Sequence, residues 1–284
     1  MSETDAKRSP LYSAQHAARY DRRALIEEYE RAYDCRLIVI FDNIFPYTIS
    51  LLEELIYDAN PKVDLHLLLA TPGGDGETAV RIIRSAQARC QEFTVIVPDL
   101  AKSAGTIIVL GAHHIIMSAT SDLGPIDPQF QLKPGSLSSA RDIIAAVDDA
   151  AQRIQAAPAT YPLFASLLSD VTAIIVQQAR SSTARTGELL EAALAANPSR
   201  DAVQVAALKE KLSGPLIESP KSHAAVFGAK EAIAAGLPVK ELLSSDPQWQ
   251  LIWKLWTRYF ALNQRVYESR SASQVLSWSQ PTTK

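Results

Sequence analysis

Two stretches, LLLATPGGDG at residues 67–76 and VIVPDLAKSAGT at residues 95–106, carry the strongest structural signal in this chain. Each begins as an apolar run and ends in a turn of small residues, which is the pattern of a buried strand followed by a strand-to-helix turn. Two further apolar runs lie at residues 36–41 and 115–117. Segments of helical character separate the runs, at residues 50–57, 77–89 and 103–110. Near-continuous apolar strands that alternate with helices predict an α/β fold with a mainly parallel sheet covered on both faces.

Outside this alternation the pattern of the sequence changes. A charged amphipathic stretch at residues 12–33 predicts a leading helix, and residues 248–267, which hold three of the four Trp, predict a late one. Ala- and Leu-rich segments between them predict helices at residues 138–155, 163–180, 188–195 and 202–212. We therefore predict an N-terminal helix (1–34), a core in two pieces (35–137 and 213–245), a helical insertion (138–212), a C-terminal assembly helix (246–268) and a mobile tail (269–284).

The composition is that of an ordinary globular protein. The chain has 284 residues, 47% of them hydrophobic and 21% charged, and its formal net charge is −3. This near-neutral balance argues against nucleic acid as a partner. Cys35 and Cys90 are far apart and have no second ligand at zinc spacing, so neither a disulfide framework nor a metal site is expected. The start lacks the apolar segment of a secretory signal, and no apolar run reaches the roughly 18 residues of a membrane span, so we expect a cytoplasmic protein.

The two turns are where chemistry is expected. They follow adjacent parallel strands, and open α/β sheets place their ligand sites at the carboxyl ends of such strands. Ser103 stands at the first turn of a helix, beside backbone N–H groups that have no partner within the helix. The N–H groups of Gly73, Gly74 and Ala104 could form an oxyanion hole there. The alternative interpretation is structural: the glycines only make a tight turn, and Ser103 only caps its helix.

The motifs TPGGDG, KSAGT and LGPIDPQ occur in this order at residues 71–76, 102–106 and 123–129. Together they resemble the SDH-type serine proteinases of the Clp/crotonase superfamily, which are relatives of signal peptide peptidase A. The resemblance implies a Clp/crotonase-like fold and a serine peptidase that is ATP-independent, needs no cofactor, acts on a peptide or protein and forms a homo-oligomer. It also implies that Ser103 is the nucleophile and that the glycines of the TPGG turn donate to the oxyanion.

The group that accepts the proton of Ser103 has several candidates. Lys102 adjoins Ser103, but neighbouring side chains at a helix start point apart, so Lys102 is only an alternative base. Clp protease has its histidine about 25 residues after the serine, and the corresponding position here is Asp127, whose carboxylate could orient a histidine. The resemblance places His223 where the family has a histidine before its last βα unit. We predict Ser103, His223 and Asp127 as nucleophile, base and orienting carboxylate. For Asp122 we favour a role in capping a turn over that of a second candidate for the orienting carboxylate.

The other histidines favour structural roles. His66 alternates with leucines in a predicted strand, where a hydrogen-bond partner is expected, and His16 is expected to be exposed on the leading helix. The adjacent pair of His113 and His114 suggests a metal, but no carboxylate follows at ligand spacing. We therefore expect no metal site.

Aromatic residues follow a helical spacing near the end of the chain, at Trp249, Trp253, Trp256, Tyr259 and Phe260. This spacing predicts one aromatic face, which either packs on its own core or forms a contact between subunits. Because the folds that this chain resembles form rings and dimers, we favour the subunit contact.

Two other classes of function remain open from the sequence. A crotonase-type acyl-CoA enzyme would use the same paired oxyanion turns without a nucleophile, and the serine at the helix start argues against it. A non-catalytic oligomeric scaffold would keep the fold without an effective base. No GxGxxG turn follows a strand, so a nicotinamide cofactor has no support.

Overall fold

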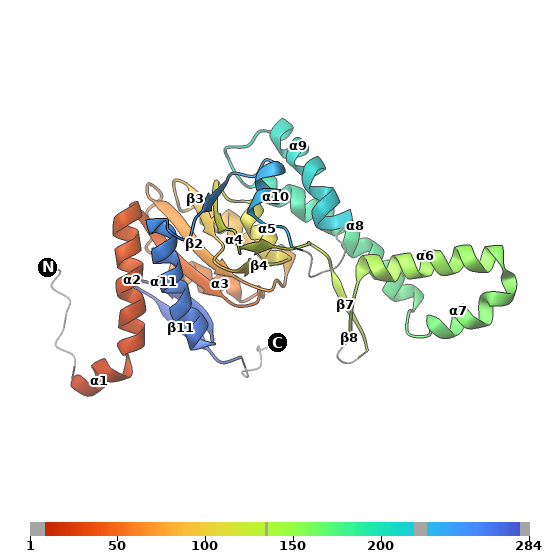
Figure 1. The fold of residues 1–284 in the computed structure, drawn as a ribbon, viewed down its shortest axis with the longest axis horizontal. Coiled ribbons are helices and arrows are strands. Elements are labelled where there is room, and N and C mark those ends of the chain that lie inside the picture. The colour runs from red at the N-terminus through yellow and green to blue at the C-terminus, as the bar shows by residue number, and fades with distance from the viewer. Residues whose placement is uncertain (1–8, 134–135, 219–225, 279–284) are drawn as a thin grey trace.

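The computed structural model describes residues 9–133, 136–218 and 226–278 (Figure 1). The helices are α1 (Pro10–Gln15), α2 (Ala17–Tyr33), α3 (Thr48–Leu55), α4 (Gly76–Gln87), α5 (Ala104–Leu110), α6 (Ala140–Ala156), α7 (Tyr161–Leu167), α8 (Ala173–Ala195), α9 (Ala202–Ser213), α10 (Ala229–Ala234) and α11 (Pro247–Leu262). The strands are β1 (Cys35–Phe41), β2 (Asp64–Ala70), β3 (Phe93–Ile96), β4 (Leu100–Ala101), β5 (His114–Ser118), β6 (Asp122–Leu123), β7 (Gln129–Lys133), β8 (Ser136–Ser139), β9 (Val239–Leu242), β10 (Arg265–Ser269) and β11 (Ser273–Leu276). Two short helical turns, Pro158–Thr160 and Gly214–Glu218, complete the elements.

The central sheet has seven strands in the order β11-β10-β1-β2-β3-β5-β9. The five strands from β1 to β9 in this order run parallel, and the hairpin of β10 and β11 adds two antiparallel strands at one edge. The four predicted apolar runs are β1, β2, β3 and β5. The prediction of an α/β fold with a mostly parallel sheet is therefore confirmed.

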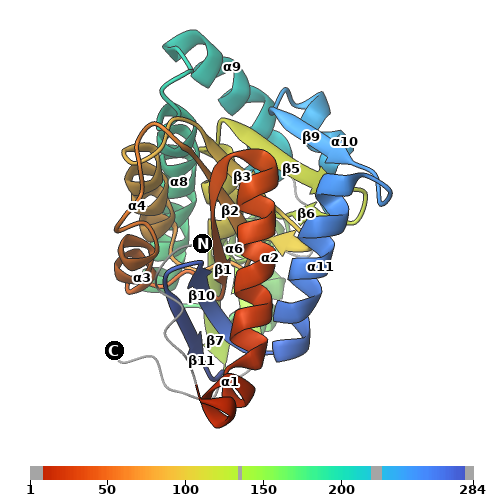
Figure 2. The same ribbon diagram turned by 90° about the vertical axis from the view of Figure 1, so that its left-hand side faces the viewer.

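Both faces of the sheet are buried, which explains why its strands are continuously apolar. In β2, Leu65, Leu67 and Leu69 pack into the core beneath α3, α4 and α5, whereas Leu68 and Ala70 face the opposite core. This alternation follows from the two-residue period of a strand. Figure 2 shows α2 and α11 side by side over the second face, and their contacts confirm that they pack together.

The predicted leading helix is present but divided. Instead of one helix over residues 12–33, α1 ends before His16, and α2 begins after it. His16 stacks on Tyr12 with ring centroids 4.1 Å apart. The buried face of α2 includes Leu25, Ile26 and Tyr29, which anchor it to the sheet.

The late aromatic helix packs mainly on its own core. Trp249, Trp256 and Tyr259 are buried against α2 and the sheet, whereas Trp253 and Phe260 are 47% and 67% exposed. The prediction of a single aromatic face is therefore wrong, because the buried face of α11 is rotated away from Trp253 and Phe260. Three of the five aromatic side chains are not free for a contact between subunits.

The predicted helix over residues 248–267 is also too long. The helix α11 ends at Leu262, because Asn263 adopts a left-handed conformation with φ 48°. The chain then turns into β10, which pairs with β1 and buries Tyr267, whose hydroxyl donates to Asp42 at 2.8 Å. The prediction of a mobile tail from residue 269 onward is also wrong as far as residue 278, because β11 continues the sheet there.

The Ala- and Leu-rich stretch is divided into helices differently from the prediction. The predicted helices at 163–180 and 188–195 are replaced by the short α7 and the long α8, which begins where the Thr172 side chain accepts the N–H of Ile175. Figure 1 shows α6 and α7 extending away from the sheet. The later part of α8 belongs to the main core, where Leu190 and Leu194 are fully buried. Among the described helices, none combines the length and apolar character that crossing a membrane requires.

Candidate functional site

The two small-residue turns lie against each other at the carboxyl ends of the parallel strands. The N–H of Thr71 donates to the carbonyl of Leu100 at 3.0 Å, and the N–H of Lys102 donates to the carbonyl of Thr71 at 3.0 Å. These bonds extend the pairing of β2 and β3 into both turns. Gly105 permits this close approach, because a Cβ there would lie 2.4 Å from the Thr71 side chain. The juxtaposition predicted from the sequence is therefore present.

Ser103 has an unusual backbone conformation at the start of α5. Its φ of 49° and ψ of −112° place a non-glycine residue in a sparsely populated region. Its side chain makes no capping hydrogen bond to α5, so the interpretation of Ser103 as a simple helix cap is wrong. A sharp turn of this kind between a strand and a helix presents the nucleophilic serine of many hydrolases.

Glycine is required beside Ser103. A Cβ on Gly73, whose φ is 120°, would lie 2.7 Å from the Ser103 Cβ and 3.4 Å from its Oγ. Gly74, with φ 140°, passes so close to Ile44 that a Cβ there would lie 2.1 Å from the Ile44 carbonyl oxygen. The TPGG turn is thus held between Ile44 and the serine.

The backbone N–H groups around Ser103 differ in what they bind. The N–H of Gly73 donates to the Thr71 hydroxyl at 3.1 Å. Among the described residues, the N–H groups of Gly74 and Ala104 have no hydrogen-bond partner. Gly74 and Ala104 therefore retain donors for a substrate oxygen, whereas Gly73 would first have to release the threonine.

A pocket of about 300 Å³ opens in front of Ser103. Its walls come from the two turns, from the segment after β6 and from α8. The lining residues are Gly74, Asp75, Gly76, Glu77, Ser103, Ile107, Ile126, Asp127, Pro128, Ser182, Arg185, Thr186 and Leu189. The pocket thus combines apolar side chains, such as Ile107 and Leu189, with charged ones, such as Glu77, Asp127 and Arg185.

The helix α8 is fastened over this pocket by one bidentate ion pair. Arg185 contacts the carboxylate of Glu77, at the start of α4, through Nε at 2.6 Å and Nη2 at 2.9 Å. Leu189 packs so close to Gly76 that a Cβ on the glycine would lie 2.9 Å from its side chain. The sequence carried no chemical signal for α8, so this wall of the pocket was not predicted.

Of the proposed triad, Ser103 and Asp127 line the same pocket. Asp127 is 6% exposed, and its carboxylate accepts a hydrogen bond from the Gln129 amide at 3.2 Å. His223 lies outside the described residues, so its role as base stays a prediction. The structure thus brings together the predicted nucleophile, the predicted carboxylate and the predicted oxyanion donors.

Lys102 is directed away from this pocket. Its ammonium is ion-paired with Asp122 and also donates to the Leu123 carbonyl at 3.3 Å. The lysine stem runs along Gly124, where a Cβ would lie 2.1 Å from its Cδ. Asp122 in turn accepts the N–H of Phe227 at 3.0 Å. Neither Lys102 nor Asp122 lines the pocket with Ser103, which favours structural roles for both.

The remaining histidines are engaged in hydrogen bonds. His66 is 8% exposed, and its Nδ1 shares a hydrogen bond with the Tyr29 hydroxyl at 3.0 Å, as the sequence predicted. Burial lowers the pKa of His66 to about 4. The N–H of Phe93 donates to Nδ1 of His113 at 2.9 Å, and Nε2 of His114 lies 2.8 Å from Glu92. Within the described part of the chain, no group of three or more His, Cys, Asp or Glu could hold a metal ion.

Parts of the chain are similar to known proteins. Residues 52–155 match the family described as ClpP-like SDH-type serine proteinase, which confirms the resemblance predicted from the motifs. Two uncharacterized proteins of Methanocaldococcus jannaschii are similar to part of the chain. One is 43% identical over 70 residues, which is 25% of this chain and 24% of the relative. The other is 35% identical over 72 residues, which is 25% of each. The similar segment therefore spans about a quarter of each relative.

Proposed function

We propose that the protein is an ATP-independent serine peptidase in which Ser103 is the nucleophile. The hydroxyl oxygen of Ser103 attacks the carbonyl carbon of a peptide bond, and His223 takes up the hydroxyl proton. The developing oxyanion accepts hydrogen bonds from the N–H groups of Gly74 and Ala104. His223 then passes the proton to the leaving amine, and water hydrolyses the acyl-enzyme by the same route.

The conformation of Ser103 is the observation that carries this proposal. A serine that only capped its helix would have an extended backbone and a side chain bonded to the first turn. Ser103 has neither, and its strained φ of 49° persists beside a glycine that leaves room for its side chain. Strain of this kind, about 1–3 kcal/mol, is retained where the surrounding structure holds a functional group in position.

The surroundings of Ser103 support acyl transfer more than other chemistry. Among the residues that the structure describes, the N–H groups of Gly74 and Ala104 in the turns beside it have no partner, and the buried Asp127 shares its pocket. The contact of Lys102 with Asp122 argues against lysine as the base, because it holds the lysine nitrogen outside the pocket that Ser103 lines. In the proposal, Asp127 therefore orients His223 and does not itself accept the proton.

An active-site probe tests the proposal directly. We expect a fluorophosphonate to label the wild-type chain and to leave Ser103→Ala unlabelled. Ser182→Ala is the matched control, since Ser182 lines the same pocket from α8, and it should be labelled like the wild type. Equal labelling of the wild type and Ser103→Ala would remove Ser103 as the nucleophile.

The base is tested by the same probe. His223→Ala and Asp127→Asn should slow labelling by roughly 10²–10⁴-fold, the range in which an acid–base group and its orienting partner act. If His223→Ala is labelled at the wild-type rate, a group other than His223 accepts the proton of Ser103. Binding of coenzyme A in calorimetry, together with absent labelling, would favour the acyl-CoA alternative instead.

A further inference from the structure

A buried polar network joins the two ends of the segment between β1 and α3, residues 42–48. Asp42, which follows β1, and Thr48, which begins α3, are both fully buried. The hydroxyl of Tyr267, from β10, donates to Oδ2 of Asp42 at 2.8 Å and lies 3.1 Å from the Thr48 hydroxyl. One phenol hydroxyl therefore contacts both ends of this segment.

Further hydrogen bonds hold the segment from within. Oδ1 of Asp42 accepts the N–H of Asn43 at 2.7 Å, and its Oδ2 also accepts the Tyr47 hydroxyl at 3.0 Å. The Thr48 hydroxyl accepts the N–H of Phe45 at 3.0 Å. Burial raises the pKa of the Asp42 carboxyl group, and the donated hydrogen bonds act in the opposite direction. A buried network that is paired in this way makes a segment rigid.

The middle of the segment contacts the TPGG turn. The N–H of Ile44 donates to the Gly73 carbonyl at 2.8 Å, and the Ile44 carbonyl accepts the N–H of Asp75 at 2.7 Å. The Gly73 carbonyl and the Gly74 N–H belong to one planar trans peptide group, in which the two bonds point in opposite directions. By fixing this carbonyl, Ile44 therefore also fixes the direction of the Gly74 N–H, one of the two proposed oxyanion donors.

A second contact to the same carbonyl comes from within the turn. The Thr71 hydroxyl lies 3.3 Å from the Gly73 carbonyl oxygen. This bond is longer than that of Ile44, and because Thr71 belongs to the turn, it moves with the turn. Ile44 belongs instead to a segment that Tyr267 holds from another strand. The place of the turn relative to Ser103 therefore depends on residues 42–48.

We propose that Tyr267 is a positioning residue for the peptidase reaction: through Asp42 and Thr48 it holds Ile44, which directs the N–H of Gly74 toward the oxyanion. The inference rests on the proposed role of Ser103 as the nucleophile. Tyr267 does not line the pocket of Ser103, so it acts only through its neighbours. Displacement of a catalytic group by about 1 Å slows a reaction by up to about 10²-fold, which gives a buried strand residue an influence on the rate.

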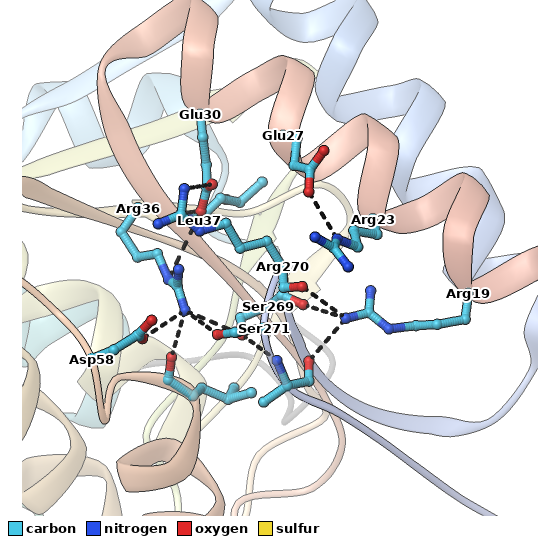
Figure 3. A network of polar contacts seen from close by, with 12 residues as sticks. Arg19, Arg23, Glu27, Glu30, Arg36, Leu37, Asp58, Ser269, Arg270 and Ser271 are labelled. Carbon is cyan, nitrogen blue, oxygen red and sulfur yellow. Dashed lines mark hydrogen bonds and ion pairs between the residues drawn. The ribbon is translucent and has the colours of Figure 1, made fainter. Parts of the chain in front are cut away.

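The same pair of strands carries another polar network at its other end, which provides a control. Figure 3 shows Arg36, from the start of β1, reaching the turn after β10. Its Nη2 donates to the Ser271 hydroxyl at 2.7 Å and to Asp58 at 3.0 Å, and the residue is 7% exposed. None of these three residues lines the pocket of Ser103. Loss of this network should loosen the pairing of β1 with β10 without displacing the TPGG turn.

Fluorophosphonate labelling of single variants tests the proposal. Tyr267→Phe removes only the hydroxyl, and we expect it to slow labelling of Ser103 by about 10–10²-fold. Thr48→Val should slow labelling in the same way, because a methyl group replaces the hydroxyl that Tyr267 contacts. Thr48→Ser keeps that hydroxyl and should be labelled like the wild type.

Two controls separate position from stability. Tyr29→Phe removes an equally buried and hydrogen-bonded hydroxyl in the core on the other face of the sheet, and Arg36→Met removes the network of Figure 3. Both should lower the urea midpoint and leave the labelling rate of the folded protein unchanged. Tyr267→Phe should in addition speed hydrogen exchange in residues 71–76, where the N–H of Asp75 donates to Ile44.

Labelling of both Tyr267→Phe and Thr48→Val at the wild-type rate would overturn the proposal. Equal slowing in Tyr29→Phe or Arg36→Met would overturn it too, because labelling would then follow stability alone. Equal labelling of the wild type and Ser103→Ala is a different result. It removes the proposed nucleophile, and with it the reaction for which Tyr267 positions a donor.

Discussion

Replacing Gly74 by alanine probes how the turn after β2 is built and what it does. Gly74 has φ 140°, a conformation that alanine rarely adopts, and the new Cβ would lie 2.1 Å from the Ile44 carbonyl oxygen and 2.9 Å from the Ile44 nitrogen. Ordinary contacts of a carbon atom begin at about 3.5 Å. Because the clash is with backbone, no side-chain rotation relieves it, and the turn must move by about 1.4 Å.

The expected loss of stability follows from the contacts that this movement breaks. The N–H of Ile44 donates to the Gly73 carbonyl at 2.8 Å, and the N–H of Asp75 donates to the Ile44 carbonyl at 2.7 Å. Each hydrogen bond contributes about 0.5–1.5 kcal/mol, and an alanine held at this φ costs about 1–3 kcal/mol. We therefore expect Gly74→Ala to lower the free energy of unfolding by about 2–6 kcal/mol.

The same movement displaces the N–H of Gly74 from its place beside Ser103. Removal of one oxyanion donor slows acyl transfer by about 10²–10³-fold, so fluorophosphonate labelling should slow by that factor under conditions where the variant is still folded. Stability is measured by urea denaturation, and labelling by gel fluorescence over time. Gly187→Ala is the control, since Gly187 lies within α8 and a Cβ there would meet nothing within 4 Å. It should raise stability by up to about 1 kcal/mol and leave labelling unchanged.

Two results would contradict this prediction. A Gly74→Ala protein with wild-type urea midpoint would mean that Ile44 does not confine the turn. A destabilised protein that is labelled at the wild-type rate would mean that the N–H of Gly74 does not bind the oxyanion.

Three further predictions concern other residues. Burial lowers the pKa of His66 from 6.5 to about 4. Between these two pH values, His66 is therefore protonated in the unfolded chain but neutral in the folded chain. Stability should fall by up to about 3 kcal/mol between pH 6.5 and 4, and His66→Gln should remove this part of the pH dependence of urea denaturation. Lys102→Arg should keep labelling within about tenfold of wild type, because the pair with Asp122 needs only a cation; complete loss would restore Lys102 as the base. Burial raises the pKa of the Cys35 and Cys90 thiols, that of Cys90 to about 12, so a thiol reagent at about pH 8 should react with both only in urea, and rapid reaction of the native chain would contradict this.

Local patterns in the sequence were sufficient to predict the central strands and the two turns. A continuous apolar run before a glycine-rich turn has few alternatives to a buried parallel strand, and β1, β2, β3 and β5 lie where those runs are. The same logic predicted that Ser103 would meet the TPGG turn, because the carboxyl ends of neighbouring parallel strands share one edge.

The predictions failed where the same local pattern fits two structures. The late helix was predicted to run to residue 267, but residues 265–269 form β10, because the edge of β1 offers a row of backbone partners that periodicity does not reveal. Burial likewise divides the aromatic set of α11, with Trp256 inside and Phe260 outside. How far a helix face is rotated toward its core depends on the elements it packs against, not on spacing alone.

Local patterns were thus enough to predict the class of fold, the strand-to-helix turn of Ser103 and the glycines beside it, because each depends on residues close together in the chain. Long-range packing, in contrast, brings Arg185 to Glu77, 108 positions away, so that α8 is fastened over the pocket, and it brings Lys102 to Asp122, outside that pocket. These features rest on charged side chains from different elements. Their pairing is set by how the helices and strands pack, and no local period records it.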